Sequence, residues 1–367
     1  MSSHINLTFL CFIMGMVLAN LALAMPYYPN KIMNSHDVVD LYGKPKIISA
    51  SKVSVCIITY QHANFIEKCL ESVVNQEVNF DYEIILGEDH SQDETVQIVK
   101  RYADAYPNLI KAYVRQQNLG AKQNFLNCFL QCRGEYVVNI EGDDYWTDSC
   151  KLQKQADFLD NHLTASACFH NAEIIFEDGS ERPTQLVNSP NQALWTHTVD
   201  FFKEKETWFM ATASVMMRRE LVNPLPSWFK DCKSGDIPMY IILAERGPIG
   251  YIPEIMSVYR KHLGGQSYTD SIKSKEFLLN RIYMYTVLNE YTNKKYNEFV
   301  NPILADYHEM LIHCDEYRWN LKQKKRHFLL AYRLQTNQNL KTYFKLLRKN
   351  LFLQIVNYGR IFLNQLR

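Results

Sequence analysis

Acidic side chains gather directly after two apolar runs of this 367-residue sequence. They are Asp89 and Asp93, which follow the run ending at Leu86, and Glu141, Asp143 and Asp144, which follow the run ending at Ile140. Carboxylates this close repel one another unless a cation or hydrogen-bond donors offset their charge. Oxygen ligands suit Mg²⁺ or Mn²⁺, and such ions commonly link carboxylates to substrate phosphates. The pattern therefore predicts a metal-dependent site for a nucleoside diphosphate.

Each acidic group also has a purely structural interpretation. Asp89 and Ser91 could cap a helix, and Asp143 with Asp144 could form a turn. For Asp93 alone we favour the structural role. Two glycine-rich phosphate-binding patterns, G-x-G-x-x-G and G-x-x-x-x-G-K-[ST], are absent, so a nucleotide would have to be held in another way.

The elements that must position these residues alternate between strand and helix. Continuous apolar and β-branched runs predict strands, and polar starts before amphipathic segments predict helices. The predicted strands are 53–59, 82–86, 110–115 and 135–140, and the predicted helices are 64–76, 91–106 and 118–132. This order predicts an α/β fold with a mostly parallel sheet and helices on both faces. Ligands of such sheets bind at the carboxyl ends of the strands, where the acidic residues stand.

The second half of the chain is less regular. We expect a helix to about 162, strands near 165–176, 214–218, 249–252 and 256–260, and a helix after Gly235 and Asp236. From 271 to 367 the sequence predicts helix throughout, since Pro302 and Gly359 are the only proline and glycine of this region. The expected division is a segment 1–50, a domain 51–266 and a helical extension 267–367.

Composition narrows the class of protein. The chain is 47% hydrophobic and 22% charged, which excludes collagen, low-complexity disorder and polytopic membrane proteins. Nine cysteines without a C-x-x-C pair favour reduced thiols. The net charge of +1 hides an asymmetry, since residues 321–367 hold eleven Lys or Arg and no acid, against 29 basic and 39 acidic residues elsewhere.

The first thirty residues carry no Lys, Arg, Asp or Glu, and Leu7 to Met25 is nearly all apolar. A signal peptide, a single membrane anchor and a start upstream of the true domain all fit this segment. We favour the anchor or the upstream start over export, because the basic region of a signal peptide is missing. Lysines after the segment would keep the rest of an anchored chain cytoplasmic, so the expected location is the cytoplasm, with possible membrane association.

Three blocks in order carry a family resemblance: VSVCIITYQHANFIEKCLESVVNQ, ILGEDHSQDET and GEYVVNIEGDDYW. From about Ser51 to Gln266 the chain resembles the family 2 glycosyltransferases with the GT-A fold. That fold is a Rossmann-like, mostly parallel sheet with helices on both faces, here followed by a helical C-terminal extension.

The resemblance implies roles residue by residue. Thr59 and Tyr60 look like nucleobase contacts, and Asp89 looks like the carboxylate that binds the base. Asp143 and Asp144 resemble the DxD element that ties a divalent ion, Mn²⁺ or Mg²⁺, to the diphosphate of the donor.

The remaining roles are less regular. Glu141 stands where the family more often has Asp, so its contact with the donor ribose is less secure. Asp236, in KSGDIPMY, resembles the general base, although it could simply cap a helix. Arg260 and His262 resemble the segment that closes over the diphosphate, and His262 could equally lie on a loop surface.

The implied reaction transfers a sugar with inversion from a nucleotide-diphosphate sugar to a hydroxyl of a glycan or lipid-linked acceptor, in surface glycan biosynthesis. Asp236 would accept the proton of that hydroxyl. A sugar-phosphate nucleotidyltransferase is an alternative, but it needs a glycine-rich loop with Arg and Lys that 59–65 lacks. A degenerate, non-catalytic glycan- or nucleotide-binding module is the second alternative, and the retained acids speak against it.

Other side chains have simpler interpretations. We interpret His62, His90 and His170 as ordinary loop residues, and Tyr145 and Trp146 as core or as the floor of the acceptor site. Residues 340–367 place apolar side chains at three- and four-residue spacing among basic ones, which suits either an anionic membrane surface or packing on the body. The acidic body argues against nucleic acid as a partner.

Overall fold

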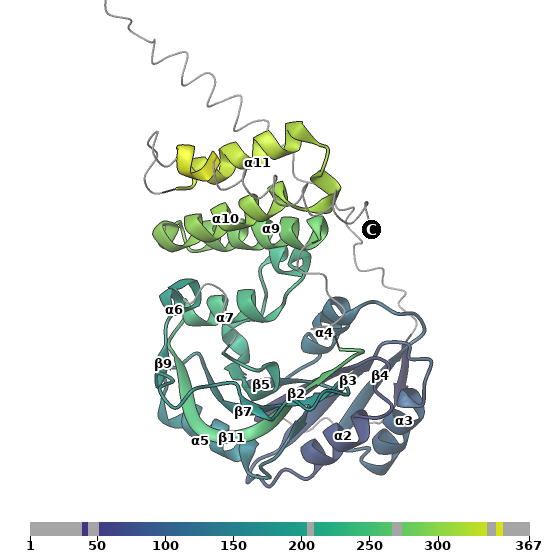
Figure 1. Cartoon of the computed structure of the whole chain (residues 1–367). Coiled ribbons are helices and arrows are strands. Elements are labelled where there is room, and N and C mark those ends of the chain that lie inside the picture. Colours follow the sequence, from purple (N-terminus) through teal and green to yellow (C-terminus); the bar gives the residue numbers. More distant parts are fainter. Residues whose placement is uncertain (1–38, 43–50, 204–208, 266–273, 336–342, 348–367) are drawn as a thin grey trace, which may run out of the picture. The chain divides into compact units, whose positions relative to one another are not determined.

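The computed structural model describes residues 39–42, 51–203, 209–265, 274–335 and 343–347 (Figure 1). Its strands are β1 (Val39–Tyr42), β2 (Val53–Thr59), β3 (Tyr82–Glu88), β4 (Ile110–Arg115), β5 (Tyr136–Glu141), β6 (Tyr145–Trp146), β7 (Ala167–Glu177), β8 (Gln185–Leu186), β9 (Trp195–Thr196), β10 (Met216–Arg218) and β11 (Ile249–His262). Its α-helices are α2 (Ile66–Val74), α3 (Thr95–Ala105), α4 (Ala121–Phe129), α5 (Lys151–Asn161), α6 (Thr198–Lys203), α7 (Asp236–Ala244), α9 (Lys275–Tyr291), α10 (Asn297–Ile312) and α11 (Leu321–Arg333). Short 3₁₀ turns occupy Thr212–Ser214, Arg219–Leu221, Ser227–Asp231 and Asp315–Tyr317.

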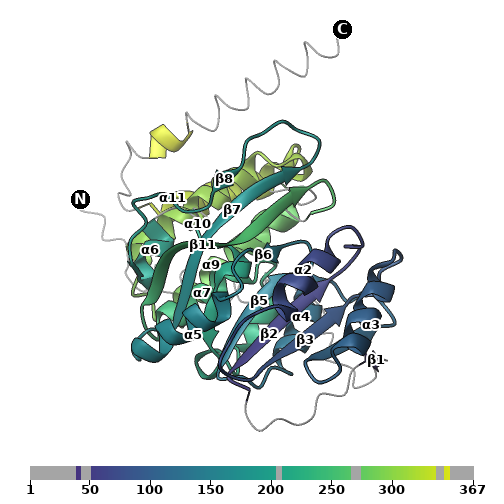
Figure 2. The ribbon, with the colours of Figure 1, turned by 90° about the horizontal axis from the view of Figure 1, so that it is seen from below.

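The described strands form one mixed sheet in the order β1-β4-β3-β2-β5-β10-β7-β11-β6. Strands β4, β3, β2 and β5 are parallel, so their carboxyl ends meet at one edge. β7 and β11 are also parallel and run side by side (Figure 2), whereas β1, β6 and β10 pair antiparallel with their neighbours. The expected mostly parallel α/β sheet is confirmed.

Side chains on the two faces of the sheet pack into two separate hydrophobic cores. On one face, Val53, Val55 and Ile57 of β2 pack with α2, α3 and α5. On the other face, Cys56 of the same strand packs with α4 and with a larger core around α7. Because successive strand side chains point to opposite faces, a continuous apolar run such as 53–59 fits a strand covered on both sides.

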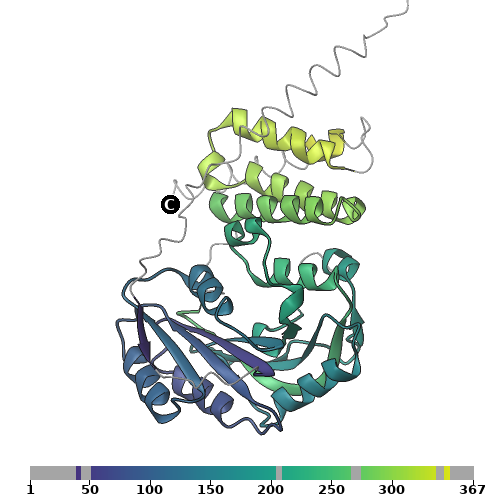
Figure 3. The same ribbon diagram turned by 180° about the vertical axis from the view of Figure 1, so that it is seen from behind.

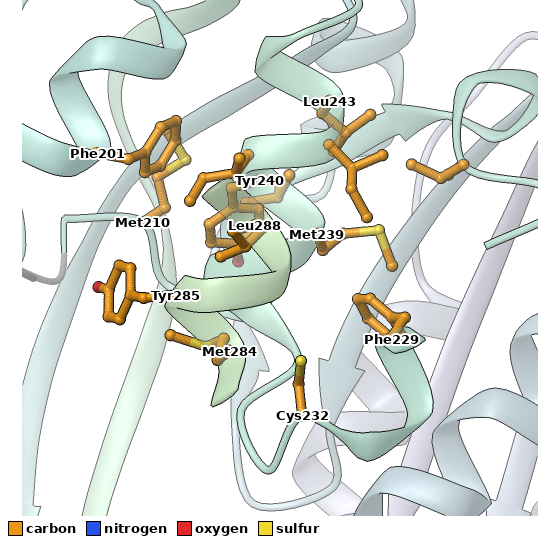
Figure 4. Close-up of a cluster of buried hydrophobic side chains, with 14 of the residues drawn as sticks. Phe201, Met210, Phe229, Cys232, Met239, Tyr240, Leu243, Met284, Tyr285 and Leu288 are labelled. Carbon is orange, nitrogen blue, oxygen red and sulfur yellow. The ribbon is translucent and has the colours of Figure 1, made fainter. Parts of the chain in front are cut away.

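The helical extension packs onto the second of these cores. Figure 4 shows Met239, Tyr240 and Leu243 of α7 among apolar side chains that include Tyr285 and Leu288 of α9. Helices α9 to α11, the yellow-green helices of Figure 3, then stack on one another. Thus α7, the helix that begins with Asp236, is held by both the sheet and the extension.

The structure corrects several local predictions. The strands expected at 249–252 and 256–260 are one strand, β11, with irregular register between Ile252 and Ser257. The bulge disrupts the apolar alternation that a regular strand would show, which is why the sequence suggested two pieces. His170 is not a loop residue, because it lies within β7 and is fully buried.

The two ends of the chain fall largely outside the described residues. The apolar segment Leu7 to Met25 lies there, and so does 340–367 apart from residues 343–347. Among the helices that the structure describes, none has the length and apolar character needed to cross a membrane.

Lys151 is a fully buried lysine at the start of α5. Its Nζ lies 4.0 Å from the centroid of the Trp146 ring and has no hydrogen-bond partner among the described residues. Burial lowers the pKa of its amine well below the usual value, because the low-polarity surroundings disfavour the charged form. The described part of the chain therefore holds a buried amine whose only close polar contact is the face of an aromatic ring.

We predict that Lys151→Met raises the free energy of unfolding by roughly 1–3 kcal/mol, since it removes an unpaired polar group. Between the lowered pKa of the folded state and about pH 10.4, unfolding of the natural chain takes up a proton at this lysine. The stability of the natural chain therefore rises with pH in that window, and the variant loses that part of the rise. Denaturant titration at about pH 7 and about pH 9 measures both effects. Lys325→Met, at an exposed position of α11, is the control. A Lys151→Met chain less stable than the natural one would contradict this account.

Candidate active site

The turn after β5 brings three carboxylates to the edge of the sheet. The backbone N–H of Gly142 donates to Ile58 O of β2 at 2.9 Å, and that of Asp144 donates to Glu141 O at 3.0 Å. A Cβ on residue 142 would lie 2.6 Å from Thr59 Oγ1, so only glycine fits this contact between two strand ends. The glycine of Glu-Gly-Asp-Asp is thus explained by close packing against β2.

Asp143 meets two histidines from distant parts of the chain. Its Oδ2 lies 3.0 Å from His262 Nε2 at the end of β11 and 3.7 Å from His62 Nε2 in the turn after β2. One ligand atom from each of these three side chains lies within 4.8 Å of the others. His262 is therefore part of the site and not a loop-surface residue, and it is 7% exposed.

The two histidines favour the ionised form of Asp143. Burial opposes ionisation of Asp143, but the hydrogen bond from His262 and the interaction with His62 outweigh it and lower its pKa. Burial lowers the pKa of His62, and the attraction of Asp143 acts in the opposite direction. A carboxylate with two imidazole nitrogens is a donor set that can bind a divalent transition-metal ion.

The turn that carries His62 is fixed by the residues after β3. The backbone N–H groups of Gln61, His62 and Ala63 donate to Ser91 Oγ, Thr95 Oγ1 and Asp93 Oδ2 at 2.8, 2.9 and 3.1 Å. Asp93 Oδ1 also accepts from Thr95 N at the start of α3, which confirms its structural role. Gln61 itself has a φ of 58°, a left-handed conformation that non-glycine residues seldom adopt.

Asp144 does not belong to this group of three ligands among the described residues. Its side chain is buried, and its Oδ1 accepts from the backbone N–H of Arg260 at 2.9 Å. Burial, followed by the neighbouring Asp143 and Glu141, raises its pKa well above the usual value. Its role as a metal ligand stays a prediction.

Arg260 is a buried cation beside the acidic turn. Its guanidinium lies 4.6 Å from the ring centroid of Tyr145 and 5.1 Å from that of Phe65. Its Nε approaches Glu177 Oε1 to 3.4 Å without hydrogen-bond geometry, and its Nη1 has no hydrogen-bond partner among the described residues. Buried guanidinium donors are normally satisfied, so this group is suited to bind an anion.

Asp89 has a structural task that the sequence did not indicate. Its two carboxylate oxygens accept from Leu119 N and Gly120 N, both at 2.8 Å, and so fix the loop before α4. Burial raises its pKa, although these two hydrogen bonds act in the opposite direction. Thr59 is buried with its Oγ1 3.2 Å from His62 Nδ1, whereas Tyr60 is 41% exposed. The nucleobase contacts of these residues stay predictions.

Asp236 lies in the first turn of α7, and the N-cap is Gly235. An acidic side chain in the first turn is favourable near the positive end of the helix dipole, so the role of Asp236 as general base stays a prediction. Burial raises the pKa of Glu141 to about 8, with further contributions from Asp143 and Asp236. Since Asp236 contributes to the raised pKa of Glu141, the two carboxyl groups lie close enough to interact electrostatically.

The comparisons with known proteins identify the family of the sheet domain. Residues 54–225, just under half of the chain, match the family model described as glycosyl transferase family 2. These residues belong to that family. The resemblance of the three sequence blocks is therefore confirmed.

Relatives of this family 2 member are diverse. An uncharacterized protein of Mycobacterium tuberculosis is 35% identical over 228 residues, which cover 60% of this chain and 63% of that protein, less than two thirds of its length. The minor teichoic acid biosynthesis protein GgaB of Bacillus subtilis is 24% identical over 271 residues, covering 73% of this chain and 29% of GgaB. The crystal structure of residues 1–349 of Staphylococcus aureus TarS with UDP-GlcNAc has a TM-score of 0.54 and 17% identity, covering 77% of this chain and 81% of that one. This likeness supports the expected GT-A fold.

His62 is the site residue that sequence reasoning missed. We interpreted it as a loop residue, and it does lie in a turn, but its ring points to Asp143. The available signal was its position three residues after the end of β2, at the same sheet edge as the acids. His90, by contrast, is an exposed residue between β3 and α3, as expected.

Proposed function

We propose that this family 2 member transfers a sugar, with inversion, from a nucleotide-diphosphate sugar to an acceptor hydroxyl. The observation that carries the proposal is the convergence of Asp143, His62 and His262 beside a buried Arg260 with an unpartnered Nη1. Such a group suits a diphosphate together with a divalent cation. The TarS structures with UDP-GlcNAc and with UDP support this class of donor.

The donor set suits Mn²⁺ better than Mg²⁺. Two imidazole nitrogens and one carboxylate fit a borderline transition ion, whereas Mg²⁺ prefers an all-oxygen octahedron. We propose that Asp143, His62 and His262 hold the ion. When bound, it would offset the negative charge of the departing nucleoside diphosphate.

The protein's own groups supply the remaining chemistry. Arg260 donates to the diphosphate and stabilises charge as it develops on the leaving group. Asp236 accepts the proton of the acceptor hydroxyl while that oxygen attacks the anomeric carbon. The nucleoside of the donor would lie at the same edge of the sheet, against Thr59, Tyr60, Asp89 and Glu141.

The acceptor is proposed from the relatives. GgaB and the Escherichia coli chondroitin synthase, which is 25% identical over 289 residues, are both named for polymer synthesis. A surface glycan or a lipid-linked precursor of one is therefore the acceptor class that we propose. The basic C-terminal region would bring the enzyme to a membrane that carries such an acceptor.

The first prediction concerns the cation. Asp143→Asn should weaken Mn²⁺ binding by more than the roughly 10–100-fold that loss of an outer partner costs, and His62→Gln and His262→Gln should each weaken it strongly. Calorimetric titration with Mn²⁺ alone measures this. Asp144→Asn is the informative comparison, because its Oδ1 is occupied by Arg260 N and its effect should be smaller. If Asp144→Asn lost the ion and Asp143→Asn kept it, the ligand assignment would be wrong.

The second prediction concerns the proton. Asp236→Asn should retain donor affinity and lose transfer by a factor of about 10²–10⁴, since a general base acts on the acceptor and not on the nucleotide. Release of nucleoside diphosphate, screened over a panel of nucleotide sugars with Mn²⁺, measures the rate. Asp104→Asn, on the exposed side of α3, is the control. A transfer rate close to that of the natural chain would leave Asp236 with a structural role alone.

The third prediction concerns the membrane. Lys322, Lys325 and Arg326 are exposed on α11, and the sequence from 321 to 367 has no acid to balance them. A chain starting near Lys31 should bind anionic vesicles, and removing 340–367 should weaken that binding, at about 1 kcal/mol per basic residue near the surface. Added salt should reduce the attraction. Equal sedimentation with vesicles for both chains would show that 340–367 does not contribute to membrane binding.

A further inference from the structure

Lys122 is a partly buried lysine for which the proposed mechanism has no role. It is the second residue of α4, and its Nζ donates to the backbone carbonyl of Ser234 at 3.2 Å. The same Nζ lies 3.9 Å from the centroid of the Phe229 ring. A charged side chain is thus fixed against the segment that leads into α7.

Gly235 makes this approach possible. A Cβ on residue 235 would lie 3.2 Å from Lys122 Nζ, which is tighter than most real contacts of that kind. The residue that follows is Asp236, the first residue of α7. Lys122 therefore contacts the two residues before the proposed general base.

The charge of Lys122 also acts on Asp236. Burial lowers the pKa of Lys122 to about 8, while Cys232 and Asp236 act in the opposite direction. The interaction between Lys122 and Asp236 is an attraction between an ammonium group and a carboxylate on the neighbouring segment. Glu141 of β5 and Tyr240 of α7 also interact with Asp236.

Lys122 connects two sides of the site. The loop before α4 is held by the carboxylate of Asp89, through Leu119 N and Gly120 N. Two residues further on, Lys122 holds Ser234 and so the start of α7. The short stretch of backbone from 119 to 122 therefore links Asp89, which is expected beside the nucleobase, to the segment before Asp236, the proposed general base.

We propose that Lys122 is a positioning residue: it fixes the backbone before Asp236 through Ser234 and holds a positive charge near that carboxylate, so that Asp236 is oriented to accept the proton of the acceptor. This rests on the proposed function of Asp236.

The test compares Lys122→Met, Lys122→Arg and the matched control Lys100→Met, whose Nζ also lies over an aromatic ring, 4.6 Å from Tyr42, on α3. Lys122→Met should leave the affinity for the donor nucleotide unchanged, lower kcat on the order of tenfold, and move the acidic limb of the kcat profile to higher pH. Lys122→Arg should recover part of kcat, because the charge remains. Unchanged kcat and an unchanged limb in Lys122→Met would overturn the proposal.

A second readout does not depend on turnover. Carbon-13 NMR titration of the aspartate carboxyl groups, with Asp236 assigned through Asp236→Asn, should show a higher Asp236 pKa in Lys122→Met than in the natural chain. An equal pKa overturns the proposal even if the natural chain proves inactive, so failure of the proposed function is recognised separately. If Lys122→Met does not fold, Gly235→Ala, which crowds Nζ, should give the same direction of change.

Discussion

The accumulation of negative charge at the end of β5 is the constraint on which the rest of the site depends. Asp143 and Asp144 are adjacent, largely removed from water, and each needs a different partner. Asp143 is offset by His262 and His62, and Asp144 accepts the backbone N–H of Arg260. Without these contacts the repulsion and the loss of hydration would oppose the fold of the turn itself.

That constraint explains the unusual course of β11. The strand runs for 14 residues along β7, changes register near its middle, and pairs antiparallel with β6 at Ser257 and Val258. This path carries Arg260 and His262 to the acids of β5, more than a hundred residues earlier in the chain. A regular, shorter strand would leave both side chains away from the carboxylates.

The helical extension packs against the helix that begins with Asp236. Through Tyr285 and Leu288, helix α9 completes the core that seats α7, and α7 begins at Asp236. For this part of the extension, packing on the body is observed. The basic residues on α11 are exposed, so the proposed membrane contact would involve a different part of the extension from the packing.

The sequence by itself determined the parallel α/β order and the sheet edge that bears the acids, because apolar runs and strand-end residues are local patterns. It also identified Asp143, Arg260, His262 and Asp236 as candidates through the family resemblance. Only the tertiary structure decided their partners: His62 with Asp143, Asp89 with the loop before α4, and Lys122 with the start of α7. The physical reason is that hydrogen bonds and ion pairs between segments depend on strand register and on how the helices pack on the sheet. Neither register nor helix packing produces a periodic pattern in the sequence.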